Sequence, residues 1–175
     1  MTIRDVNVRL QDTPLPDDEH DNLKYLYQQS FKAINAWKAH QLRTTQQDKA
    51  RTDILENLDE KTVLVTIDWA MKFLPEKYRE TQADWFAKRG ISWHISVVVR
   101  KLNGSLQHQA LVHIVENCSQ ESDDVIVLLE HLFLSLKKSN PEIENAYLRA
   151  DNAGCYHSIS MISSVNLLKR TGITI

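Results

Sequence analysis

The spacing of apolar residues separates a helical amino-terminal part from a strand-rich remainder. From Leu23 to Leu42 apolar residues recur at intervals of three to five positions, which is typical of one face of an amphipathic helix. A second helical pattern runs from Ala50 to Leu58. Together they predict a helical hairpin within an amino-terminal segment of residues 1–60. Such a hairpin suits packing on the core or oligomerisation, and a DNA-recognition element is the alternative.

At Val63 the period changes from helical to strand-like. The run VLVTID contains β-branched residues and little polarity, which predicts a central strand covered on both faces. Two more strands are predicted over 91–102 and 106–117, joined at Asn103-Gly104, a strong signal for a tight turn. The three runs predict an antiparallel meander.

Helical and strand patterns alternate in the rest of the chain. A helix over 76–88, ended by Gly90, is predicted before the second strand. Ser122 and Asp123 can cap a long crossover helix with a broad apolar face, which ends at Asn140-Pro141. A strand over 145–151, a helix over 156–170 and the start of a fifth strand at 173–175 follow.

This order of elements predicts the fold class. The long crossover allows the strand over 145–151 to lie parallel to the strand that begins at Val63. Residues 61–175 are therefore expected to form an α/β core of the ribonuclease H-like type. Its mixed sheet would have the order 3-2-1-4-5, flanked by helices, behind the amino-terminal helical segment.

Asp68 and Asp151 each end one of the two strands expected to be parallel neighbours. Such strands lie about 4.8 Å apart, so both carboxylates are expected at one edge of the sheet. Like charges repel there unless one carboxylate is protonated or a divalent cation lies between them. Two aspartates and phosphate oxygens can hold Mg²⁺ or Mn²⁺ for phosphoryl transfer. Alone, each acid could equally cap a turn.

Further polar residues could complete such a site. A second metal ion needs a third acid, for which Glu121, Asp123, Asp124 and Glu130 are candidates, with helix capping and solvation as the alternative. His157 could act as a base or position a phosphate, or be an ordinary surface residue.

Charge limits how this chain could bind DNA. The net charge of −2 gives no overall attraction to a polyanion, whereas residues 72–101 carry a local balance of +4. A local basic patch, or simply a solvated face, is expected there. The residues expected to contact nucleic acid are Lys72, Lys77, Arg79, Lys88, Arg89, Asn152 and His157.

Cysteine usage and hydropathy indicate the compartment. The two cysteines, Cys118 and Cys155, have no zinc-like spacing, as expected of a reduced intracellular environment. No apolar run approaches the roughly 20 residues of a membrane span, so no membrane partner is expected.

Three stretches resemble a known superfamily: DWAMKFLPEKYRETQADWFAKRGISWHISVV, AYLRADNAGCYH and, upstream, WKAHQLRTTQQDKARTDIL. From about Trp37 to Ile175 the chain resembles transposon-derived eukaryotic proteins of the DDE-type transposase and integrase superfamily. The resemblance implies that Asp68 and Asp151 are the first two acids of a metal-binding triad. It also implies a nuclear protein that cleaves DNA and transfers strands, with its third acid on a helix beyond Ile175.

Two other functions stay open. One is a ribonuclease H-like nuclease in which Glu121, Asp123 or Glu130 completes the site. The other is a domesticated, catalytically inactive DNA-binding or assembly module. Without a third acid this chain is expected to show little cleavage by itself. It is also expected to form homo-oligomers, through the amino-terminal helices or an exposed sheet edge.

Overall fold

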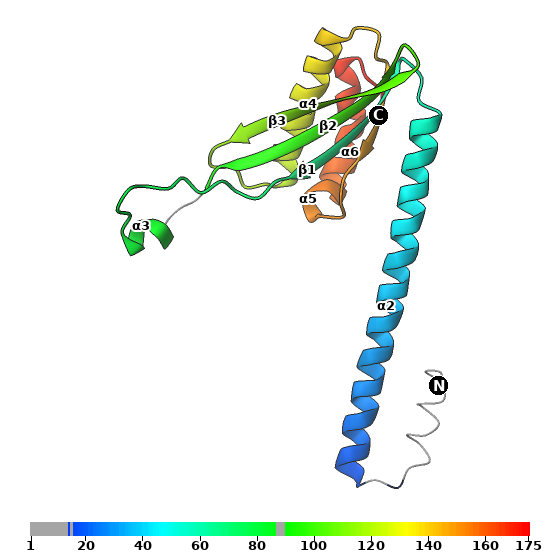
Figure 1. Ribbon diagram of the computed structural model, residues 1–175, viewed down its shortest axis with the longest axis vertical. Helices are drawn as coiled ribbons and strands as arrows, with labels where there is room; N and C mark the ends of the chain where they lie inside the picture. Colours follow the sequence, from blue (N-terminus) through cyan, green and yellow to red (C-terminus); the bar gives the residue numbers. More distant parts are fainter. Residues whose placement is uncertain (1–13, 15, 87–89) are drawn as a thin grey trace. The chain divides into compact units, whose positions relative to one another are not determined.

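Residues 14, 16–86 and 90–175 are described by a computed structural model of the chain. It is an α/β structure built around a four-stranded mixed sheet of order β3-β2-β1-β4 (Figure 1). The chain divides into two compact units, residues 1–53 and residues 54–175. The sheet and all elements after α2 belong to the second unit.

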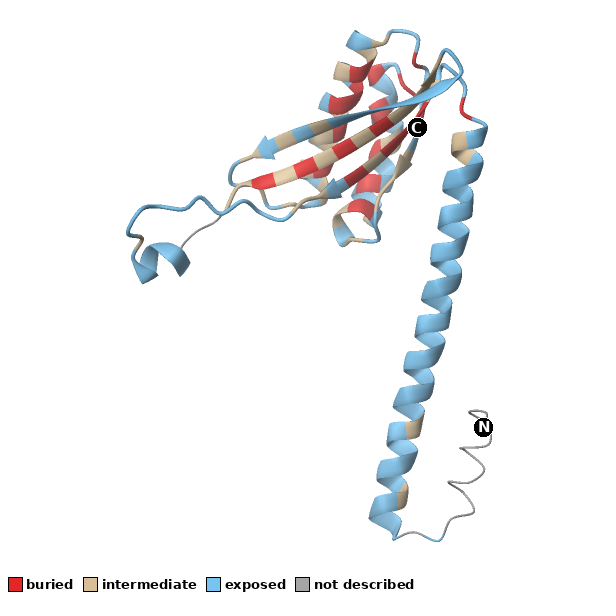
Figure 2. Cartoon of the chain, viewed as in Figure 1, coloured by how far each residue is buried: buried red, intermediate tan, exposed pale blue. Residues whose placement is uncertain are grey.

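The amino-terminal helical patterns form one continuous helix, α2 (Asp17–Glu56), of 40 residues. The predicted hairpin is therefore wrong. The segment contains neither glycine nor proline, so nothing interrupts the backbone hydrogen bonds. Thr44 and Thr45 also fit into the helix, because each hydroxyl donates to the carbonyl four residues earlier at 2.9–3.0 Å. None of the residues of α2 is buried (Figure 2).

The sheet confirms the meander and the parallel crossover. β1 (Thr62–Trp69) pairs antiparallel with β2 (Ser92–Leu102), which pairs antiparallel with β3 (Ser105–Val115). The crossover helix α4 (Ser122–Ser139) then leads to β4 (Asn145–Arg149), which lies parallel to β1. β4 ends two residues before the predicted limit.

One helix and one strand differ from expectation. The helix predicted over 76–88 is the short α3 (Gln82–Phe86), and residues 87–89 lie outside the described part. Arg79 has a φ of 53°, a left-handed conformation that no helix can contain. In place of a fifth strand, the described residues have one parallel bridge, between Thr174 and Asn145.

The helix expected over 156–170 is divided. It consists of α5 (Gly154–His157), α6 (Ile159–Leu168) and the 3-10 turn η1 (Lys169–Thr171). Ser158 separates the first two, because its backbone is extended and its hydroxyl accepts a hydrogen bond from the Met161 amide at 3.1 Å. A serine that caps a new helix satisfies donors that would otherwise lack partners.

The hydrophobic core lies between one face of the sheet and helices α4 and α6. In β1 the alternate residues Val63, Val65 and Ile67 are buried, and they pack with Leu129 and Phe133 of α4. Figure 2 shows the same alternation of buried and partly exposed residues along β2. Figure 1 shows α4 and α6 behind the sheet, so both helices cover the same face.

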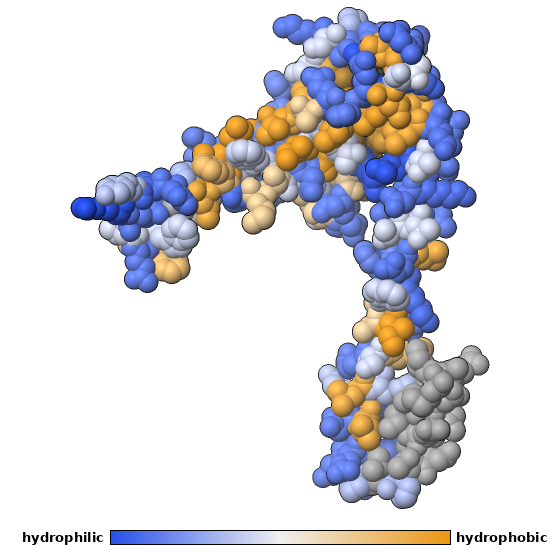
Figure 3. Space-filling model, viewed as in Figure 1, coloured by the Kyte–Doolittle hydropathy of each residue, from blue (hydrophilic) through white to orange (hydrophobic). Residues whose placement is uncertain are grey.

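The opposite side of the sheet, here called the open face, carries exposed apolar side chains. They include Leu106, Val112 and Ile114 of β3 and Tyr147 of β4, which are 48–63% exposed. Figure 3 looks onto this face and shows apolar residues running along the strands. An apolar surface of this kind favours association.

We expect the chain to self-associate through the open face. Ile114→Lys places a charge on the exposed apolar row of β3, at one edge of this surface, and should lower the average mass measured by sedimentation or light scattering. Ser105→Lys adds the same charge at the exposed β2–β3 turn and should leave the mass unchanged. If the natural chain is monomeric at high concentration, the expectation is wrong.

Candidate functional site

The parallel pairing of β1 with β4 brings the two predicted acids to one edge of the sheet. Thr66 of β1 lies opposite Arg149 of β4 in the last pair of the ladder, and Asp68 and Asp151 each follow two residues later. Asp68 belongs to β1 and pairs with Ile95 on its other side, whereas Asp151 follows the end of β4. Both aspartates are exposed. They therefore lie at the carboxyl ends of two neighbouring parallel strands, where open α/β sheets commonly bind ligands.

The turn after β4 holds Asp151 in place. Its Oδ1 accepts a hydrogen bond from the Ala153 amide at 2.9 Å, so the capping role considered from the sequence is present. The Ala153 carbonyl accepts from the Tyr156 amide at 3.0 Å and lies 2.8 Å from His157 Nδ1. Because a carbonyl can only accept, Nδ1 carries the proton and the Nε2 of neutral His157 is the basic nitrogen.

Asn152 stands between these residues and is exposed at the same turn. The structure thus brings Asp68, Asp151, Asn152 and His157 to one end of the sheet. Asn152 forms no side-chain hydrogen bond with any residue the structure describes, which leaves its amide open to an external partner.

Tyr156 belongs to α5 and was not singled out from the sequence. It is 8% exposed, and its hydroxyl forms no hydrogen bond with any described residue. Burial raises the pKa of the phenol, and the negative charges of Cys155, Asp68 and Asp151 raise it further. The nearby Trp69 backbone amide acts weakly in the opposite direction. The phenol is therefore protonated.

A cluster of aromatic and histidine side chains continues from Tyr156 across the core face. The His94 ring centroid is 6.2 Å from that of Tyr156, 4.8 Å from that of Trp69 and 6.4 Å from that of His113. His113 Nε2 is 2.9 Å from His131 Nδ1 on α4. The alternation of side chains along β2 could have revealed His94 from the sequence, because it puts His94 on the same side of the sheet as the buried Val98.

Burial decides the charge of this cluster. His94 is fully buried, neither ring nitrogen has a partner in the described structure, and burial together with His113 lowers its pKa to about 4. Burial and then the charge of His131 also lower the pKa of His113. Both rings are neutral near pH 7 and form a polar but uncharged layer on the core side of the sheet.

Two of the four candidates for a third acid are used structurally. Glu130 Oε2 accepts from Arg170 at 2.7 Å. Asp124 Oδ2 accepts from the Ser119 hydroxyl at 2.6 Å and from the Cys118 thiol at 3.2 Å, and the Ser119 bond is the main reason that its pKa is lowered. The Glu130 contact ties the middle of α4 to η1, and the Asp124 contacts hold the loop before α4.

Glu121 has a structural role as well, because it is the N-cap of α4 in place of the predicted Ser122 and Asp123 and forms a capping box with Asp124. Glu121 and Asp123 line a pocket of about 380 Å³ together with Gly154 and Cys155 of α5. Within the described parts of the chain, no group of three or more His, Cys, Asp or Glu residues is arranged to hold a metal ion. Only Asp68 and Asp151 follow the last pair of the parallel ladder by the same number of residues.

A basic arm leaves the sheet beside Asp68. It comprises residues 70–91, between β1 and β2, and carries exposed Lys72, Lys77 and Arg79. Lys88 and Arg89, also predicted to contact nucleic acid, lie outside the described residues. Arg79 stacks on the Tyr78 ring at 5.4 Å. Residues 70–91 contain five basic and three acidic residues, a balance of +2, and the arm also carries an exposed aromatic ring, Tyr78.

Gly90 closes the base of this arm. Its φ is +68°, and a Cβ there would lie 3.0 Å from Leu74 Cδ2 and 3.1 Å from Lys72 Cβ. Phe73 and Ile91 pair across the base through two backbone hydrogen bonds of 2.8 and 2.9 Å. Any other residue would strain the backbone and push these strands apart.

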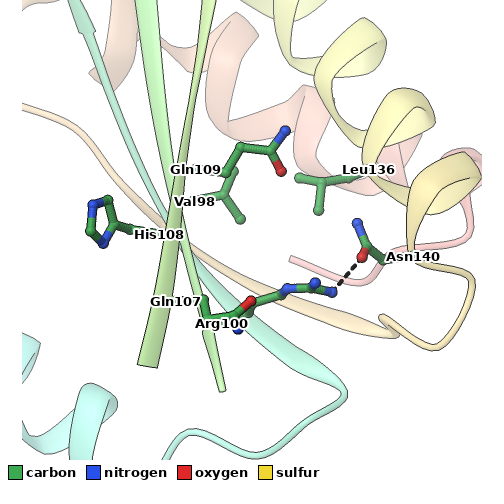
Figure 4. Close-up of a pocket in the computed structure, with 7 residues that line it drawn as sticks. All are labelled: Val98, Arg100, Gln107, His108, Gln109, Leu136 and Asn140. Carbon is green, nitrogen blue, oxygen red and sulfur yellow. Dashed lines mark hydrogen bonds between the residues drawn. The ribbon is translucent and has the colours of Figure 1, made fainter. Parts of the chain in front are cut away.

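A separate pocket lies at the far end of the strands, where Arg100 pairs with Val63. Arg100 donates hydrogen bonds to Asn140 and, at 3.4 Å, to Glu142 (Figure 4). In this view His108 points to the other side of the strands. The pocket is on the helix-covered face, away from Asp68. Arg100, although part of the basic stretch in the sequence, therefore belongs to a structural contact.

The fold and the site define a class of α/β protein: a mixed sheet with two aspartates at its carboxyl edge and a basic arm beside them. Residues 47–171 match a family model described as "Domain of unknown function (DUF8701)", and the chain belongs to this family. The searches found no match among curated proteins and none among solved structures. In the described structure, no helix has the length and apolar character needed to cross a membrane.

The buried, neutral His94 predicts that the folded protein loses stability in acid. The pKa of His94 is near 4 in the folded state and about 6.5 when unfolded, so the unfolded state binds more protons between these values. The free energy of unfolding should be highest above about pH 6.5 and fall as the pH drops toward 4, by roughly 3 kcal/mol for His94 alone. His94→Phe should flatten this dependence in denaturant titrations. His108→Phe, on an exposed residue of β3, should not.

Proposed function

We propose that this chain is the ribonuclease H-like core of a DDE-type transposase or integrase, a metal-dependent polynucleotidyl transferase acting on DNA. The parent reaction is hydrolysis of a DNA phosphodiester followed by attack of the freed 3′-hydroxyl on target DNA. The observation that carries the proposal is the parallel register of β1 and β4, in which Asp68 and Asp151 each follow the last paired residues, Thr66 and Arg149, by two positions. The nuclear location implied by the resemblance belongs to the same proposal.

The acid pair fits a hard divalent cation. Carboxylate oxygens are the ligands that Mg²⁺ and Mn²⁺ prefer, and both side chains are open to solvent, so bound waters and phosphate oxygens can complete the coordination. Asp68 and Asp151 would hold the ion. When bound, it would stabilise negative charge on the phosphate and activate the attacking oxygen. A two-metal site needs a further acid.

The residues around the pair can position the substrate. Lys72, Lys77 and Arg79 on the basic arm would contact backbone phosphates, because cations attract DNA regardless of its sequence. His157 has its basic Nε2 free to accept a proton, since Nδ1 is bound to the Ala153 carbonyl. Lys88 and Arg89 would extend the same phosphate contacts.

Metal binding gives the first test of the proposal. Mg²⁺ or Mn²⁺ binds the folded state only, so a concentration ten times Kd should stabilise the chain by about 1.4 kcal/mol and raise its melting temperature by a few degrees. Asp68→Asn and Asp151→Asn should each abolish this rise. A melting temperature that does not respond to millimolar metal would count against the metal site.

The same melting-temperature measurement distinguishes the proposed transposase core from the nuclease alternative. Glu121 and Asp123 line a pocket with Gly154 and Cys155, so they are the described acids best placed to serve a second ion in a ribonuclease H-like nuclease. Under our proposal Glu121→Gln and Asp123→Asn leave the metal-induced rise intact. Metal-dependent cleavage by the natural chain that either substitution abolishes would favour the nuclease instead.

DNA binding gives an independent test. Replacing Lys72, Lys77 and Arg79 together with glutamine should weaken binding to duplex DNA and reduce the slope of log K against log salt by about 2 to 3, roughly 0.9 for each phosphate that is no longer neutralised. Lys138→Gln, in the last turn of α4, is the control and should leave the slope unchanged. DNA binding without metal binding would indicate the catalytically inactive binding module.

A further inference from the structure

We propose that residues 23–37 of α2 bind the same segment of a second copy of this chain in an antiparallel pair. The surface that makes the contact, here called the apolar stripe, consists of the large side chains of Leu23, Leu26, Tyr27, Phe31, Ile34 and Trp37. This inference concerns α2 alone and does not rest on the proposed catalytic function.

The apolar stripe lies along one side of the helix. An α-helix has 3.6 residues per turn, so each residue is rotated by about 100° from the one before it, and Leu23, Ile34 and Trp37 lie within about 60° of one another. Tyr27 and Phe31 widen the stripe on one flank, where their rings stack at a centroid distance of 6.2 Å. The stripe is about 21 Å long, at a rise of about 1.5 Å for each residue.

The apolar stripe is exposed within its own chain. No residue of α2 is buried in the described structure, and Leu26 and Trp37 are 50% and 62% exposed. Figure 3 shows apolar side chains at the surface of this helix. Most of the stability of a helix in a protein comes from packing an apolar face rather than from helix propensity. A helix of 40 residues that exposes such a face is therefore expected to pack against a partner.

The stripe is complementary to itself when two copies run in opposite directions. A twofold axis at Ser30 would place Leu23 of one copy opposite Trp37 of the other, and Leu26 opposite Ile34. Such an axis buries the same patch on both chains. The large indole would then meet a smaller leucine, whereas a parallel pair would bring the two indoles together.

The charges along α2 favour the same direction. Residues 17–21 contain four acids and neither Lys nor Arg, whereas residues 37–43 contain Lys38 and Arg43 and no acid. An antiparallel pair centred on Ser30 places these two segments beside each other, so opposite charges attract. A parallel pair would instead place the four acids of each copy side by side, where they repel. Charge and shape thus both indicate an antiparallel second copy as the partner.

Sedimentation of the full chain tests the apolar stripe. The measurement is made in the Ile114→Lys chain, so that association through the open face does not contribute, and this chain should form dimers. Adding Ile34→Lys should raise the dimer Kd at least about 100-fold, because each chain loses one apolar side chain from the contact. Ala36→Lys is the matched control: it adds the same charge on the opposite side of α2, about 200° away, and should leave Kd unchanged.

Disulfide cross-linking tests the direction of the pair. Ser30 and Gln41 both lie on the side of the stripe, but Ser30 is at its centre. In an antiparallel pair the two copies of Ser30 are neighbours, whereas the two copies of Gln41 are about 33 Å apart along the helices. A disulfide requires Cα atoms within about 7 Å. Mild oxidation should therefore cross-link Ser30→Cys, and it should leave Gln41→Cys no more cross-linked than the natural chain.

Each other outcome overturns the inference. If Ser30→Cys and Gln41→Cys both cross-link, the helices pair in parallel and the proposed direction is wrong. If the Ile114→Lys chain is monomeric, or neither cysteine variant cross-links, the stripe does not bind a second copy. An equal rise in Kd for Ile34→Lys and Ala36→Lys would show a general effect on the helix instead of a contact through the stripe.

Discussion

The parallel pairing of β1 with β4 is the constraint on which the rest of the structure depends. It requires the crossover through α4, whose buried face, including Leu129 and Phe133, packs on the alternate residues of β1. It also fixes the register in which Asp68 and Asp151 each follow the last paired residues by two positions. A shift of one residue would turn every side chain of β4 to the other face and expose its core residues. Packing in the core thus sets the geometry of the acid edge.

The acid edge combines exposed charge with a neutral interior. The two aspartates face solvent, whereas Tyr156 and His94 on the core side of the sheet are buried and uncharged near pH 7. A nearby positive charge in that layer would bind the aspartates and compete with a metal ion. Because burial keeps the layer neutral, the negative charge of the pair stays available to an external cation. The basic arm, by contrast, holds its charges outside the core.

Some elements could be derived from residue patterns and others could not. The strand-like runs on either side of the Asn103-Gly104 turn predicted the meander, because they are local properties of the chain. The single helix α2 was mistaken for a hairpin: two apolar patterns were treated as two helices, although neither glycine nor proline separates them. The break at Ser158 was also missed, since the same serine could sit inside a helix as well as cap a new one.

The sequence by itself determined that two acids end apolar strand-like runs and that a helix long enough for a parallel crossover lies between them. These features depend on residue type and spacing alone. Only the tertiary structure decided the register that relates Asp68 to Asp151, that Glu130 is tied to Arg170, and that Tyr156 is buried. The reason is physical: strand register and burial arise from contacts between residues far apart in the chain, which no local pattern encodes.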